Sequence, residues 1–143
     1  MASWRDHASP QAQSDLDGLL NQAFPFAKQM LAKHGEFFPY AVGVSQLGEV
    51  RMFAADSGTD EHPPTTDVLQ DLREGLRSER NALRALALTS DVRVAGCDAI
   101  RVELEHSEGI AISVLLRYRH RNESGIEYGA LSADPGRAQI WAP

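Results

Sequence analysis

Residues 100–118 read IRVELEHSEGIAISVLLRY, and this stretch decides the fold. In its first part the apolar residues Ile100, Val102 and Leu104 alternate with charged residues, a pattern typical of a strand with one buried face. The segment at 107–109 predicts a tight turn, and the apolar run after it indicates a second strand, covered on both faces. Strands joined by so short a turn pair antiparallel. The sequence therefore predicts an antiparallel sheet.

Working outward from this pair, similar alternation predicts more strands, and apolar residues at steps of three and four predict two helices. We expect the first helix to begin at Ser14 or Asp15, to end at Gly35 and to be kinked or split by Pro25. The expected helices span 14–34 and 65–83, and the further strands span 38–44, 50–54, 86–94 and 126–131.

These elements follow the order α-β-β-α-β-β-β-β. We predict an α+β fold, a two-layer sandwich in which a single antiparallel sheet of five to six strands carries both helices on one face. Residues 1–13 are polar and aperiodic, so they are expected to form a mobile tail before one domain at 14–143. The length of 143 residues agrees with a single domain.

The charge balance and the cysteine content limit the classes of binding partner and the cellular compartment that we expect. The 20 acidic residues exceed the 14 basic ones, giving a formal charge of −6, which argues against binding nucleic acid or an anionic membrane surface. The only cysteine, Cys97, excludes an intrachain disulfide. No apolar stretch is long enough for a secretory signal or a membrane span, so we expect a cytoplasmic protein.

Apolar positions on the predicted strands and helices define an expected core. Because helices on one side cover only one face of a sheet, Leu115 and its neighbours on the other face would need another cover. A homodimer would supply it, and residues 137–141 folding back over that face are the alternative. The expected core includes Phe38, Val42, Leu72, Leu76, Ile100, Val102, Leu104, Val114 and Leu116.

A basic strand end at 117–121 is the strongest candidate for ligand binding. Alternation places Arg117, Arg119 and Arg121 on one face, with Tyr128 nearby on the next strand. Three aligned guanidinium groups suit a carboxylate or phosphate. The alternative is that these arginines pair with glutamates across the sheet, as oppositely charged neighbours do.

The sequence contains no motif for a metal site or for a catalytic residue. The five histidines form no metal-binding motif with cysteines or with one another, so no metal and no cofactor is expected. His106 is expected to be a boundary histidine satisfied by hydrogen bonds, and Cys97 an ordinary thiol. A buried His106 that meets an acidic partner would instead favour an enzyme.

Several stretches carry a family resemblance, among them residues 34–40, 98–106 and 127–129 with the terminal Ile140-Trp141. Together they resemble a family of short bacterial proteins that has no assigned activity, so the resemblance implies no reaction. The order of elements is also similar to that of roadblock-like and profilin-like domains, a likeness of topology that implies no function.

Three functions remain open in the sequence. The first is a non-enzymatic interaction or adaptor-type domain that self-associates as a homodimer, with another protein as a further candidate partner. The second is a small-molecule or anion-binding module at the strand end that carries Arg117, Arg119 and Arg121. The third is a small enzyme with an unidentified acid–base site.

Overall fold

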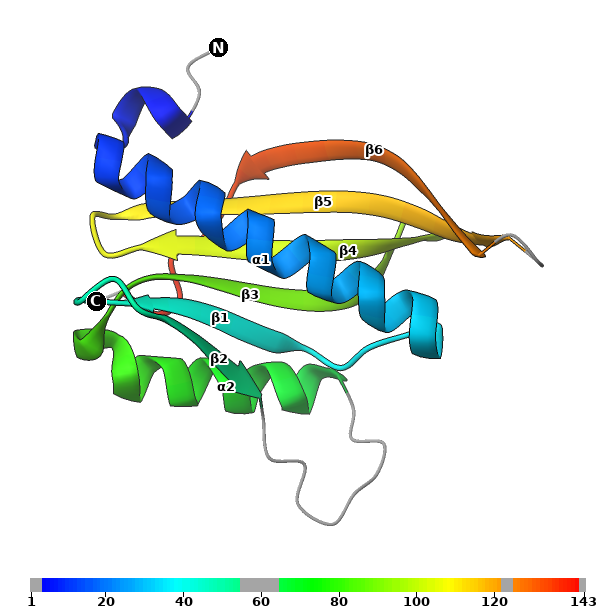
Figure 1. The fold of residues 1–143 in the computed structure, drawn as a ribbon, viewed down its shortest axis with the longest axis horizontal. Coiled ribbons are helices and arrows are strands. Elements are labelled where there is room, and N and C mark those ends of the chain that lie inside the picture. The colour runs from blue at the N-terminus through cyan, green and yellow to red at the C-terminus, as the bar shows by residue number, and fades with distance from the viewer. Residues whose placement is uncertain (1–3, 55–64, 122–124, 142–143) are drawn as a thin grey trace.

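A computed structural model of the chain describes residues 4–54, 65–121 and 125–141. It contains two α-helices and one antiparallel sheet of six strands in the order β2-β1-β3-β4-β5-β6 (Figure 1). The predicted α+β class and element order are confirmed, apart from a short 3-10 helix at the start. The elements are η1 (Trp4–His7), α1 (Pro10–His34), β1 (Tyr40–Ser45), β2 (Val50–Ala54), α2 (Thr65–Glu79), η2 (Arg80–Ala82), β3 (Leu83–Val94), β4 (Cys97–His106), β5 (Ile110–Arg121) and β6 (Gly125–Pro135).

Helix α1 begins earlier than the periodicity predicted. Ser9 is its N-cap, because the Ser9 hydroxyl accepts a hydrogen bond from the Ala12 amide, and Pro10 occupies the favoured first position. Ala12 is fully buried, so the first turn belongs to the packed domain. Pro25 does not split the helix, which runs on to the left-handed cap at Gly35.

One face of the sheet packs against α1, which crosses it diagonally (Figure 1). The side chains from β1, β3, β4 and β5 on this face alternate with outward residues, as the sequence predicted. All the expected core residues are buried except Phe38, which is 49% exposed, whereas its neighbour Phe37 is 8% exposed. Phe37 packs against Tyr40, so Phe37 and not the predicted Phe38 belongs to the core.

Helix α2 packs on the opposite face, so the expectation that both helices share one face was wrong. Its residues Val68, Leu72 and Leu76 cluster with Leu86 and Leu88 of β3, which point away from α1. The physical reason is that β3 is apolar at successive positions and is therefore buried on both sides. Two-sided burial was predicted for β5, where the outward residues are only half-buried.

The chain after β6 also covers the second face. We call residues 136–141 the C-terminal strap; it passes behind the sheet in Figure 1. Ile140 is 1% exposed and joins the α2 cluster. Both carboxylate oxygens of Glu105 accept a hydrogen bond from the Ile140 amide at 3.1 Å. The alternative that the C-terminal residues fold back over this face is therefore the one that the structure adopts.

No helix in the described part of the chain is long and apolar enough to cross a membrane.

Candidate functional site

The edge strand β2 carries an exposed apolar surface. Val50 is 56% exposed and Met52 is 55% exposed, and the β1–β2 turn adds Leu47 at 87%. Val50 and Met52 pair with Val44 and Val42 of β1, so both point to the α1 face of the sheet. Monomeric proteins rarely leave neighbouring apolar side chains uncovered at a strand edge. This edge is the best candidate for an interaction surface.

The opposite edge of the sheet is protected in ways that β2 is not. Strand β6 has an irregular register against β5, between Leu116 and Tyr118, and it ends at Pro135. It also carries Glu127 and Asp134. Bulges, prolines and charges are the devices that prevent edge strands from pairing with other chains. The five residues of β2 have a regular register and a single charged side chain, Arg51.

The predicted arginine cluster lies on exposed β5 near the β5–β6 connection. Arg119 and Arg121 both form ion pairs with Glu127, the cross-strand pairing that the sequence analysis gave as the alternative. Glu127 is paired by register with Arg119, whereas Tyr128 is paired with Tyr118 on the other face. The structure therefore keeps the arginines on one face and separates them from Tyr128, which instead lies against Lys28 of α1.

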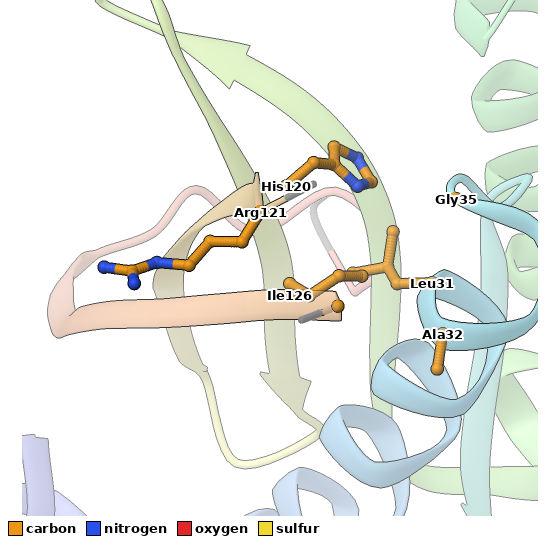
Figure 2. Close-up of a pocket in the computed structure, with 7 residues that line it drawn as sticks. Leu31, Ala32, Gly35, His120, Arg121 and Ile126 are labelled. Atoms are coloured by element: carbon orange, nitrogen blue, oxygen red, sulfur yellow. The ribbon is translucent and has the colours of Figure 1, made fainter. Parts of the chain in front are cut away.

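A pocket of about 480 Å³ lies between the end of α1 and the β5–β6 hairpin (Figure 2). Leu31, Gly35, Ile126 and His120 contribute to its walls. In Figure 2 the imidazole of His120 lies on the side of Gly35, but the Arg121 side chain extends away from α1. Because the negative end of the α1 dipole also faces this region, the pocket offers little to an anion.

A second pocket, of about 590 Å³, opens beside the α1–β1 connection. Its polar wall includes Asp91, which accepts a hydrogen bond from the Tyr118 hydroxyl at 2.5 Å. Burial raises the pKa of Asp91, and the nearby Asp98 and Glu36 carboxylates act in the same direction. Burial also raises the pKa of Tyr118, and its bond to Asp91 adds to the effect. The pair is a half-buried acid–phenol contact that joins β3 to β5.

His106 does meet a buried acidic partner, Asp15 of α1. Its Nε2 lies 3.0 Å from the Asp15 carboxylate, and its Nδ1 accepts a hydrogen bond from the Glu108 amide at 3.1 Å. Asp15 accepts two further bonds from Arg84, each at 3.0 Å, and one from Gln11. Because both ring nitrogens and both carboxylate oxygens are engaged, this cluster leaves no lone pair positioned to take a proton from a substrate. Its geometry holds α1 against β3 and β4.

Metal and thiol chemistry receive no support from the described residues. Within residues 4–54, 65–121 and 125–141 no group of three or more histidine, cysteine or acidic side chains could hold a metal ion. Cys97 is exposed at the start of β4, in the turn where Ala95 and Gly96 have positive φ.

The β2 edge could not be identified as a surface from the sequence. Strands at 38–44 and 50–54 were predicted, but local patterns do not show that β1 pairs with β3 on its other side and leaves β2 outermost. The alternation of Val50 and Met52 was the available signal, and a buried strand face has the same alternation. Asp15 could not be predicted as the partner of His106, because the two residues are 91 positions apart.

The fold and these sites define the chain as a small α+β protein built on one six-stranded antiparallel sheet with a helix on each face. Comparison with known proteins finds no matching family model, no matching curated protein and no matching solved structure.

Proposed function

We propose that this protein is a non-enzymatic interaction domain that self-associates. The observation that carries the proposal is the exposed apolar edge of β2, where Val50 and Met52 lie uncovered beside the exposed Leu47. Transfer of such side chains from water into an interface is favourable by about 25 cal/mol for each Å² of apolar area. A second copy of the chain is the commonest partner for a surface of this kind.

The two other functions have less support. An anion-binding module would need the guanidinium groups of Arg119 and Arg121, but both already form ion pairs with Glu127. An enzyme would need a base with a lone pair directed at a substrate. The buried contact of His106 with Asp15 is saturated, and the Asp91 carboxylate in the second pocket accepts the Tyr118 hydroxyl. As part of the same proposal we place the protein in the cytoplasm, where an exposed, unpaired thiol such as Cys97 stays reduced.

Sedimentation equilibrium across micromolar concentrations tests the proposal. We expect the apparent mass to rise from 15.7 kDa toward twice that value as the concentration increases. A mass of 15.7 kDa at every concentration would overturn self-association. Binding of phosphate or a dicarboxylate that is lost in Arg119→Ala, with no change in mass, would favour the anion-binding function instead.

A further inference from the structure

We propose that two copies of this chain pair through their β2 strands, antiparallel and two-fold symmetric about Met52, to form one continuous twelve-stranded sheet. The inference rests on the proposed self-association and specifies its geometry: which edge pairs, in which direction and in which register. It follows from three features of β2, namely the direction of its backbone groups, the position of its one charge and the faces of its side chains.

The backbone of β2 presents groups outward at alternate residues, and no other described strand pairs with them. Ser45 donates its amide to the Glu49 carbonyl at 2.8 Å, which fixes that pair as a hydrogen-bonded one. In an antiparallel ladder such pairs alternate with pairs that are not hydrogen-bonded. The β1–β2 register then assigns Arg51 and Phe53 to the hydrogen-bonded set. The amides and carbonyls of Val50, Met52 and Ala54 therefore point away from β1, toward an incoming strand.

Only one register between two β2 strands lets all of these outward amides and carbonyls form hydrogen bonds. When Met52 faces the partner's Met52, Val50 faces the partner's Ala54, and every residue of the strand Val50–Ala54 has a partner. A shift by two residues in one direction sets Arg51 against the partner's Arg51. The shift in the other direction sets Phe53 against the partner's Phe53 and leaves Val50 without a partner in the strand. Like charges directly opposite each other destabilise a strand pair. The register centred on Met52 avoids that contact.

The side chains match on both faces in this register. On the α1 face, Val50 and Met52 of the two copies form one apolar strip across the two-fold axis. On the other face, Arg51 lies opposite the partner's Phe53. The Arg51 guanidinium already lies 5.7 Å from the ring of its own Phe53, so it is placed to contact the second ring as well. A five-residue strand pair is a small interface, and we expect micromolar affinity.

Charge substitutions at the two-fold axis test the register. In Met52→Lys or Met52→Glu alone, like charges face each other, and we expect the dimer dissociation constant to rise about tenfold or more. Mixing the two variants sets opposite charges face to face and should restore dimers as a heterodimer. The matched control is Leu131→Lys on β6, where the side chain is 61% exposed, and it should leave dimerisation unchanged.

Outcomes of this test separate the two proposals. If the wild-type protein dimerises but Met52→Lys does not weaken the dimer, or Leu131→Lys weakens it equally, the β2 geometry is wrong and self-association stands. If the wild type is monomeric throughout, both proposals fail. Recovery of dimers in the mixed sample supports the register, and failure to recover them contradicts it.

A cysteine variant provides a second measurement that does not depend on charge. In a Cys97→Ser background, Met52→Cys should form an intermolecular disulfide under mild oxidation, because the α-carbons of a hydrogen-bonded antiparallel pair lie about 5.5 Å apart. Leu131→Cys in the same background is the control for random collision. Equal rates of cross-linking at the two positions would overturn the pairing.

Discussion

Asp15 is the residue on which the attachment of α1 to the sheet most depends. Burial alone raises its pKa, but the hydrogen bonds from Arg84, His106 and Gln11 outweigh this and hold the pKa below its ordinary value. A carboxylate with a lowered pKa stabilises the fold above its unfolded pKa of 3.8 and loses that contribution as the pH falls below it. Asp15 therefore supports the fold at neutral pH and not in acid.

We predict that Asp15→Asn lowers the free energy of unfolding by about 2 kcal/mol at pH 7, the usual magnitude for a hydrogen bond to a charged group. The difference from wild type should shrink as the pH falls through the region below 3.8, because protonated Asp15 has lost its charge too. Urea unfolding at a series of pH values measures this.

The matched control for Asp15 is Asp17→Asn, two residues along the same helix. Asp17 also pairs with an arginine, Arg5, but both side chains are more than 40% exposed. Solvent screens such a pair, so its loss should cost no more than about 1 kcal/mol. Equal effects of the two substitutions would show that the buried cluster stabilises the fold no more than an exposed ion pair does.

Among the elements, the C-terminal strap depends on one glycine. The Gly136 amide donates to the Ala111 carbonyl at 2.9 Å. A Cβ on Gly136 would lie 2.8 Å from the Ile112 nitrogen and 2.9 Å from the Ile112 carbonyl carbon. These are backbone atoms, which cannot move aside as the end of a side chain can, so the strap crosses β5 at a distance that only glycine permits.

We predict that Gly136→Ala lowers the free energy of unfolding by about 1–3 kcal/mol, the usual cost of forcing an extra carbon into a packed site. Gly129→Ala on β6 is the control, because its Cβ would meet its nearest atom at 3.7 Å, an ordinary contact. Chemical denaturation of both variants tests this. A Gly136→Ala protein as stable as Gly129→Ala would show that the strap does not pack tightly on β5.

At the scale of the whole molecule, the formal charge of −6 opposes self-association. The screening length falls from about 30 Å at 0.01 M salt to about 8 Å at 0.15 M, so added salt weakens the repulsion between two copies. The β2 pair contains no ion pair that salt could weaken in return, because Arg51 faces an aromatic ring. We therefore predict that dimerisation becomes tighter between these two salt concentrations.

Sedimentation equilibrium at the two salt concentrations measures this dependence. An interface built on ion pairs, such as Arg119 and Arg121 of one copy against acidic residues of another, would dissociate as salt increases. Weaker dimerisation at 0.15 M would therefore contradict pairing through β2 and favour an interface of charged groups.

Most helices and strands of this protein could be predicted from local sequence patterns, because each pattern depends on neighbouring residues. The strand at 100–106 was predicted from alternation within the strand itself, and the turn after it from the glycine at 109. The first helix was predicted from the spacing of Leu16 and Leu19 within one turn. Two predictions failed. The start of α1 was placed too late because the cap at Ser9 lies before the first apolar repeat, and Phe38 was placed in the core because the packing that buries Phe37 instead is decided by the assembled sheet.

Tertiary structure alone decided which surfaces are available. The placement of α1 and α2 on opposite faces, the pairing of β1 with β3 and the path of the strap each bring together residues far apart in the chain. This arrangement of helices, strands and strap leaves β2 at the edge with Met52 exposed, and it buries Asp15 against His106. A pattern of alternation shows that a strand has two faces, but only the assembled sheet determines what covers each of them.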